Sequence, residues 1–187
     1  MAIFPRLGDD AAVVDILKMS PDMGVALIQM HHEVLRAPSP LSDHQREIIA
    51  AYVSGLNKCR YCYGTHAACA EAYGTPRSIM ETWYDDLENS GIDAELIPIL
   101  KVAKILTENP SGMTEDAARA VYDAGWDEQA LHDAIAVICC FNFMNRLLEG
   151  HAVHGNEKIY DERGKLLKEY GYLPLIPRIK PSERSKA

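Results

Sequence analysis

Apolar residues recur every three or four positions in most segments of this 187-residue chain. This is the spacing of an amphipathic α-helix. In no segment do β-branched residues alternate with polar ones over the length of a strand. Proline, glycine and short polar clusters separate the periodic segments. We therefore expect an all-α fold, a single-domain bundle of about eight helices.

Two adjacent helices are expected near the middle of the chain. Ser42 and Gln45 have the spacing of a capping box, which predicts a helix over about 42–55. Asn57 is placed to cap a second helix over about 58–73. The sequence thus predicts a helical hairpin at this point.

The second of these helices presents two thiols and an imidazole on one face. At about 100° per residue, Cys59, Cys62, His66 and Cys69 fall within an arc of roughly 80°. The first helical turn, where Cys59 is expected, favours a thiolate, and an imidazolium at His66 would favour a Cys62 thiolate further. Glu47, on the preceding helix, could orient His66 or relay a proton.

Four of these residues together form the pattern E-x11-C-x-x-C-x3-H, namely Glu47, Cys59, Cys62 and His66. This pattern resembles that of the alkylhydroperoxidase D group in the carboxymuconolactone decarboxylase superfamily. The sequence of residues 41–70 is most similar to the peroxidase-related branch, and residues 95–155 resemble the family more loosely. Better-known members have histidine between the cysteines. This chain has Tyr61 there, and a helix would point it away from the thiols.

The resemblance implies an alkylhydroperoxidase-like fold and a thiol-dependent hydroperoxide reductase. Cys62, activated by His66, would attack the hydroperoxide and become a sulfenic acid, which Cys59 would resolve to a disulfide. No cofactor beyond this redox-active disulfide is implied. A dihydrolipoyl, peroxiredoxin or thioredoxin-like dithiol would reduce it. The resemblance also places Asn142 near the active site as a substrate-binding candidate, and it implies a homo-oligomer (dimer, trimer or hexamer).

Two other classes of function remain open. One is a disulfide reductase, an electron-carrier adaptor for a peroxiredoxin with negligible peroxidase activity of its own. The other is a non-redox lyase or zinc-binding module of the same fold. Decarboxylation of a lactone acid does not need a CxxC pair, and C-x-x-C-x3-H is not a standard zinc-finger spacing. Haem attachment is excluded because Tyr63, rather than histidine, follows the second cysteine.

The remaining cysteines and histidines are expected to be structural. Cys69 continues the thiol face by one turn and is expected in the core. Cys139 and Cys140 belong to a long apolar run and are expected to be inert buried thiols. Two histidine pairs are expected at the surface: His31 with His32, and His151 with His154.

The composition restricts the cellular setting and the partners. The formal net charge is −8, which argues against binding to nucleic acid or to anionic membranes. Five cysteines, an odd number, do not suggest a secreted disulfide framework. No signal peptide is visible, and no apolar stretch approaches the roughly 20 residues of a membrane span. A reducing, cytoplasmic location is expected.

The chain is expected to divide into an N-terminal arm (1–10), an all-helical domain (11–172) and a Pro-rich, charged C-terminal tail (173–187), extended or disordered. Within the domain, the helices other than the central pair are expected over about 11–18, 20–36, 75–84, 93–106, 114–122, 127–151 and 156–170. Proline at position 98 is expected to shift the start of its helix or kink it.

Overall fold

The computed structural model describes residues 3–8 and 11–181, and every regular element in this part of the chain is a helix. The all-α prediction is confirmed. There are more helices than the expected eight because several are very short. The α-helices are α1 (Val13–Lys18), α2 (Pro21–Arg36), α3 (Asp43–Leu56), α4 (Arg60–Tyr73), α5 (Arg77–Thr82), α6 (Ile97–Glu108), α7 (Glu115–Asp123), α8 (Glu128–Gly150), α9 (Glu157–Tyr170) and α10 (Ile176–Ile179). Short 3-10 helices cover Ala94–Leu96, Pro110–Gly112 and Leu173–Leu175.

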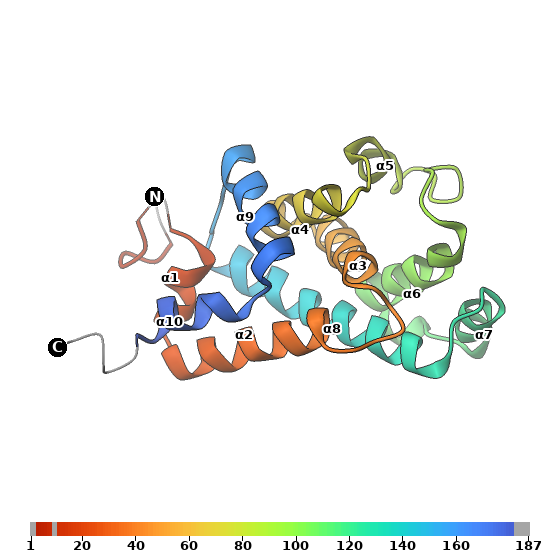
Figure 1. Cartoon of the computed structure of the whole chain (residues 1–187), viewed down its shortest axis with the longest axis horizontal. Helices are drawn as coiled ribbons and strands as arrows, with labels where there is room; N and C mark the ends of the chain where they lie inside the picture. Colours follow the sequence, from red (N-terminus) through yellow and green to blue (C-terminus); the bar gives the residue numbers. More distant parts are fainter. Residues whose placement is uncertain (1–2, 9–10, 182–187) are drawn as a thin grey trace.

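The longest helix, α8, runs along the molecule beside α2, and α3 packs across it (Figure 1). The α4 helix lies between α3 and α9 and makes most of its contacts with these two helices. By length and composition α8 alone, among the helices of the described residues, could cross a membrane, but half of its most apolar window is buried inside the bundle. It is therefore placed as the central helix of a globular core.

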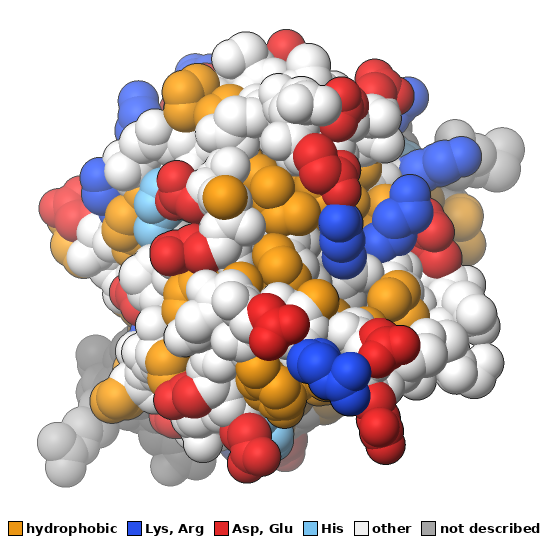
Figure 2. Space-filling model, turned by 90° about the vertical axis from the view of Figure 1, so that its right-hand side faces the viewer, with side chains coloured by type: hydrophobic (Ala, Val, Ile, Leu, Met, Phe, Trp, Pro, Cys, Tyr) orange, Lys and Arg blue, Asp and Glu red, His pale blue; other side chains and the backbone are white. Residues whose placement is uncertain are grey.

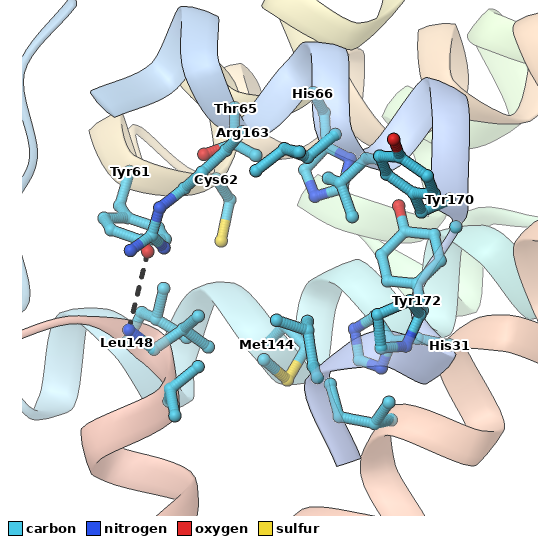
Figure 3. Close-up of a pocket in the computed structure, with 18 of the residues that line it drawn as sticks. His31, Tyr61, Cys62, Thr65, His66, Met144, Leu148, Arg163, Tyr170 and Tyr172 are labelled. Atoms are coloured by element: carbon cyan, nitrogen blue, oxygen red, sulfur yellow. Dashed lines mark hydrogen bonds between the residues drawn. The ribbon is translucent and has the colours of Figure 1, made fainter. Parts of the chain in front are cut away.

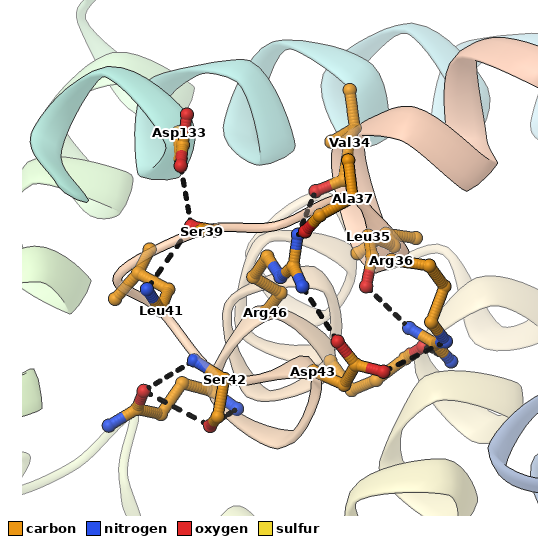
Figure 4. A network of polar contacts seen from close by, with 12 residues as sticks. Val34, Leu35, Arg36, Ala37, Ser39, Leu41, Ser42, Asp43, Arg46 and Asp133 are labelled. Carbon is orange, nitrogen blue, oxygen red and sulfur yellow. Dashed lines mark hydrogen bonds and ion pairs between the residues drawn. The ribbon is translucent and has the colours of Figure 1, made fainter. Parts of the chain in front are cut away.

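The start of α3 follows the sequence prediction. The Ser42 hydroxyl accepts a hydrogen bond from the Gln45 backbone N–H at 3.2 Å, and the Gln45 side chain accepts one from the Ser42 N–H at 2.9 Å. The Arg46 guanidinium, one residue further on, donates to the carbonyl oxygens of Val34 and Ala37 (Figure 4). These contacts fix the loop between α2 and α3, so that the register of α3 is set by its first turn.

The start of α4 lies two positions later than expected. Asn57 is the C-terminal cap of α3, and Lys58 follows in the left-handed region at φ 57°. Cys59 is then the N-cap of α4, with its N–H donating to the Ser54 carbonyl at 2.9 Å. Cys62, rather than Cys59, therefore occupies the first turn of α4.

The C-terminal tail is the largest departure from the sequence prediction. Residues 173–179 are helical instead of extended, and α10 packs against α1 and α2. Tyr172 and Ile179 are each 3% exposed. The prolines lie in the first turns of these short helices, where a backbone N–H would have no acceptor within the helix and its absence costs no hydrogen bond. Positions 182–187 of the expected tail lie outside the described residues.

The N-terminal arm contains no helix in the part that is described, residues 3–8, as expected. Its Leu7 side chain is nevertheless buried and belongs to a small apolar cluster together with Cys59 and Cys62. Positions 1–2 and 9–10 of the arm lie outside the described residues. Residues 3–8 of the arm thus pack against the CxxC segment through Leu7.

Acidic and basic side chains are interspersed on the end of the molecule where α6 and α7 lie (Figure 2). An apolar area occupies the middle of this face, with carboxylates around it. A continuous basic surface of the kind that binds nucleic acid is not present on this face.

The close contact between α4 and α9 depends on Gly164. A Cβ atom at this position would lie 2.6 Å from the backbone of Ala68 and Cys69. We expect Gly164→Ala to lower the free energy of unfolding by about 1–3 kcal/mol, because rigid backbone must move apart. Urea denaturation would measure this. Gly150→Ala is the matched control, since no atom lies within 4 Å of its Cβ position. An unchanged urea midpoint for Gly164→Ala would contradict the prediction.

Candidate active site

A cavity of about 210 Å³ lies between α4, α8, α9 and the C-terminal segment (Figure 3). Its walls are mainly apolar, with Phe141, Met144 and Leu148 from α8 and Leu167 from α9. The polar or reactive side chains on the lining are His31, Tyr61, Cys62, Thr65, His66, Tyr170, Tyr172, Arg163 and Arg178. The cavity therefore combines an apolar interior with a few chemically active groups, as small-molecule sites do.

The two cysteines of the CxxC pair have different access to this cavity. Cys62 is 4% exposed, and its sulfur points into the cavity (Figure 3). Cys59 is fully buried and does not line the cavity. Both are free thiols. A small molecule in the cavity thus meets the Cys62 sulfur first.

The expected thiolate at Cys62 is not favoured in this structure. A hydrogen bond with Cys59 and its own burial raise the pKa of Cys62 well above its usual value, against a smaller opposing effect from Asn145. These effects outweigh the first-turn position on α4. Cys62 is consequently in the thiol form at neutral pH.

Glu47 anchors the imidazole ring of His66. Its Oε2 atom lies 2.6 Å from His66 Nδ1, and the carboxylate is fully buried. An ionised carboxylate can only accept hydrogen bonds, so Nδ1 carries a proton in this pair. In the neutral ring, Nε2 then has its lone pair available, which is the form of a general base. The sequence prediction that Glu47 orients His66 agrees with this geometry.

Two further residues hold Glu47, and neither was predicted from the sequence. Arg36 Nη2 donates to Glu47 Oε1 at 2.6 Å, and the Tyr172 hydroxyl donates to the same atom at 2.8 Å. Burial alone would raise the pKa of Glu47, but His66 and Arg36 outweigh it and lower this pKa to about 2. The carboxylate is therefore ionised throughout the physiological range.

His66 and Cys62 share the cavity without direct contact. Within the described part of the chain no hydrogen bond joins the imidazole to the thiol, in contrast with the expected pairing of residues one helical turn apart. Both side chains line the same space, and Phe141 packs edge-on against the His66 ring at 4.5 Å between centroids. Proton transfer between them would therefore pass through a molecule bound in the cavity.

Asn142 does not line the cavity. Its side-chain oxygen accepts a hydrogen bond from Asn57, and its amide donates to Thr107 and to the Ile138 carbonyl. These contacts join helices α3, α6 and α8. The neighbouring Asn145 lies nearer to the chemistry, because its hydrogen bonding acts on Cys62. Both residues are polar positions in the largely apolar helix α8, and their contacts give them different roles.

Tyr61 lines the cavity, contrary to the expectation that it points away. Its hydroxyl is the acceptor for the Val13 N–H at 3.5 Å (Figure 3). Arg163 lies over its ring, with the guanidinium carbon 5.1 Å from the centroid. The residue between the cysteines thus forms part of the cavity wall.

The expectations for the other thiols are partly correct. Cys69 is buried as expected, and burial raises its pKa. Cys140 is buried, and burial raises its pKa to about 12. Cys139 was expected to be buried but is exposed, because it lies on the outer face of α8.

His31 was expected at the surface and is instead 4% exposed, on the cavity lining. Its Nδ1 lies 2.7 Å from the Leu27 carbonyl, and its Nε2 lies 3.6 Å from Cys140 Sγ. Burial lowers its pKa to about 4. The apolar spacing of α2 could have indicated this, since His31 falls between the buried Ile28 and Leu35.

His31 should make the protein sensitive to mild acid. The unfolded chain binds a proton at this residue near pH 6.5, but the folded chain does so only near pH 4. Its neutral form thus stabilises the fold above pH 6.5, and this stability is lost as the pH falls through that interval. Between pH 6.5 and 4.5 we expect a loss of about 2–3 kcal/mol.

Urea unfolding at several pH values would measure this effect. The loss between pH 6.5 and 4.5 should largely disappear in His31→Gln and remain in His154→Gln, which changes an exposed histidine. An equal loss in wild type and His31→Gln would show that another group is responsible.

The possible zinc ligands are not brought together. Glu47 faces Arg36 and His66 rather than the thiols. Across residues 3–8 and 11–181, no group of three or more His, Cys, Asp or Glu side chains is arranged to hold a metal ion. The geometry of these donors therefore does not favour the zinc-module alternative.

The comparisons with known proteins agree with this fold. Residues 21–104 match the model of the carboxymuconolactone decarboxylase family. A search of curated proteins found no match. An uncharacterized peroxidase-related protein from Silicibacter sp. TM1040 is similar in structure, with a TM-score of 0.73, 24% identity, and coverage of 81% of this chain and 79% of that chain.

A second similar structure is described as an alkylhydroperoxidase AhpD core, an uncharacterized peroxidase-related protein from Ralstonia eutropha JMP134. Its TM-score is 0.74 at 18% identity, and the match covers 88% of this chain and 96% of that chain. The chain is thus similar to the carboxymuconolactone decarboxylase family over α2 to α6, and its all-α fold is similar to that of the alkylhydroperoxidase AhpD core.

Proposed function

We propose that this protein is a thiol-dependent reductase of organic hydroperoxides in which Cys62 is the attacking thiol. The observation that carries the proposal is the position of the Cys62 sulfur, which faces an apolar cavity shared with His66 and is backed by Cys59. The peroxidase-related names of the two similar structures support the general class.

The reaction balances without an added cofactor. The Cys62 sulfur attacks the distal peroxide oxygen, the O–O bond breaks, and the alkoxide takes a proton and leaves as an alcohol. His66 Nε2 is placed to receive the thiol proton through the bound peroxide and to pass it to the leaving oxygen. The Cys59 sulfur then attacks the Cys62 sulfenic acid, releasing water and forming a disulfide.

A slender dithiol is the reductant that this geometry favours. Cys62 is the sulfur nearer to solvent, so an incoming thiolate would attack it through the cavity and displace Cys59. A dihydrolipoyl arm can enter such a space more easily than the folded surface of a peroxiredoxin or thioredoxin-like protein. We propose a dihydrolipoyl carrier as the electron donor, in a reducing cytoplasmic setting suited to five free thiols.

Stopped-flow mixing of the reduced protein with cumene hydroperoxide tests the proposal. We expect two thiols per chain to be lost, with one disulfide between Cys59 and Cys62 found by mass spectrometry. If peroxide leaves the thiols intact while dihydrolipoamide rapidly reduces a preformed disulfide, the protein is an electron-carrier adaptor and the peroxidase proposal fails. If neither reagent acts, the redox role fails altogether.

We also propose that the protein forms a homo-oligomer. The adjacent helices α2 and α8 expose apolar side chains, including Met30 and Phe143, that a second copy could cover. Light scattering coupled to gel filtration would give the mass in solution. A particle of 20.8 kDa, the mass of one chain, would refute an oligomer.

A further inference from the structure

Arg163 contributes a positive charge to the lining of the cavity. It is half-buried, and within the described residues no carboxylate lies within 4 Å of its guanidinium. Its position over the Tyr61 ring leaves the donor N–H groups of the guanidinium at the cavity edge (Figure 3). A partly desolvated arginine without an ionic partner is a ready site for an anion.

A second arginine adds to the positive charge. Arg178 also lines the cavity, and like Arg163 it has no ion pair within the described part of the chain. Burial and the charge of Arg178 lower the pKa of Arg163, while Asp15 acts weakly in the other direction. Asp15 is itself paired with Lys18 at 3.2 Å. The two guanidinium groups therefore repel one another, and among the described residues Asp15 acts on both of them only from beyond ion-pair distance.

The Thr65 hydroxyl gives independent support for a polar ligand. Thr65 is 5% exposed and lines the cavity, yet its Oγ1 atom has no hydrogen-bond partner among the described residues. Thr65 follows Tyr61 by one helical turn, so it lies on the side of the cavity where Arg163 lies (Figure 3). A buried hydroxyl without a partner is costly, and a bound ligand could satisfy it.

The rest of the cavity is suited to hydrocarbon. Its inner wall is formed by side chains such as Phe141, Met144 and Leu167. The buried charge of Glu47 is already neutralised by Arg36, so a ligand does not need a positive group to balance it. The cavity thus offers a positive edge and an apolar interior with the Cys62 sulfur between them.

We propose that Arg163, assisted by Arg178 and Thr65, binds the carboxylate of an amphipathic organic hydroperoxide whose hydrocarbon part fills the apolar cavity beside Cys62. This inference rests on the proposed function for its reaction, but the carboxylate site itself exists independently of turnover. It names a substrate class: hydroperoxides of carboxylic acids with an apolar chain. Neutral hydroperoxides such as cumene hydroperoxide would react without using the arginines.

Calorimetric titration of the reduced wild-type protein tests binding without chemistry. Decanoate, 1-decanol and decylammonium share a chain and differ in charge. We expect decanoate to bind at least about tenfold more tightly than decanol, equivalent to about 1.4 kcal/mol, and decylammonium to bind most weakly. Equal binding of decanoate and decylammonium would overturn the proposal without any variant.

Substitution then locates the site. Arg163→Met retains an apolar side chain over Tyr61 and should weaken decanoate binding about tenfold while leaving decanol binding unchanged. Arg163→Lys should restore part of the lost affinity. Arg119→Met, which removes an exposed arginine of α7, is the matched control. If Arg163→Met binds decanoate as tightly as wild type, Arg163 serves only to cover Tyr61 and the proposal is wrong.

Kinetics separates this inference from the proposed function. Linoleic acid hydroperoxide and its methyl ester should both oxidise Cys62. The KM should be about tenfold lower for the acid than for the ester, and this difference should disappear in Arg163→Met. Equal KM values for acid and ester would overturn the carboxylate site while leaving the peroxidase proposal intact. If no hydroperoxide reacts but decanoate still requires Arg163, the proposed function has failed and the anion site stands.

Discussion

Replacing Cys62 by serine is expected to lower the rate of hydroperoxide consumption by about 10⁴-fold, because the attacking sulfur is removed. Cys59→Ser should behave differently. Its Cys62 sulfur still faces the cavity, so one equivalent of peroxide should react and leave a sulfenic acid, but no disulfide can follow. Peroxide consumption under single and multiple turnover, with dimedone trapping and mass spectrometry, measures both effects.

Cys139→Ser provides the matched control, since this exposed thiol lies on α8 outside the cavity. Its rate should equal that of the wild type. Sulfenic acid trapped at residue 59 in Cys62→Ser, with none at residue 62 in Cys59→Ser, would reverse the assignment of the two thiols. Full turnover in both variants would refute the role of the pair.

Glu47→Gln should have the largest effect on stability, about 3–5 kcal/mol. The side chain of Arg36 is only 8% exposed, and without the Glu47 carboxylate its buried charge would keep only the longer 3.6 Å contact with the more exposed Asp43. His66 would also lose the charge that fixes its tautomer, so the peroxidase rate should fall by about 10²–10⁴-fold. Urea unfolding and stopped-flow oxidation measure the two losses separately.

Two comparisons isolate the buried pair. Asp43→Asn removes the more exposed partner of the same arginine together with the Asp43 contact to Arg46 (Figure 4), and it should still cost less than Glu47→Gln because Asp43 is partly solvated. The double change Glu47→Gln with Arg36→Met should be more stable than Glu47→Gln alone, because no uncompensated charge remains. Additive losses in the double variant would show that the ion pair is not the cause.

The pH dependence of the same contact has a defined sign. The pKa of Glu47 is about 2 in the folded chain, below its ordinary 4.5. Its contribution to stability is therefore complete above pH 4.5 and is lost as the pH falls toward 2. This loss, between pH 4.5 and 2, lies mostly below the loss between pH 6.5 and 4 that is assigned to His31. Acid unfolding should therefore show two separable losses of stability.

Local signals in the sequence predicted what lies close together along the chain. The Ser42 and Gln45 cap begins α3 as expected, and Pro98 falls in the first turn of α6, whose start it shifts. The face shared by Cys62 and His66 also follows from helical spacing alone. These features depend on residues within one or two turns of each other.

The parts that the sequence did not indicate depend on long-range contacts. Arg36 and Tyr172 reach Glu47 from distant segments, and nothing local marks them as its partners. The burial that keeps Cys62 protonated likewise comes from packing between helices, which opposes the local effect of the helix N-terminus. The same holds for residues 173–179. Their prolines and charges predicted an extended tail, but contacts of α10 with α1 and α2 hold this segment in helical form.

The hydrogen bond from Tyr172 to Glu47 joins residues 125 positions apart. During synthesis, a ribosome would release α3 and α4 well before it reached this tyrosine. A nascent chain would therefore contain the CxxC segment before the full set of donors to Glu47 had been made. The order of synthesis therefore delays completion of the hydrogen bonds that hold Glu47, and with it His66, until nearly the whole domain has been made.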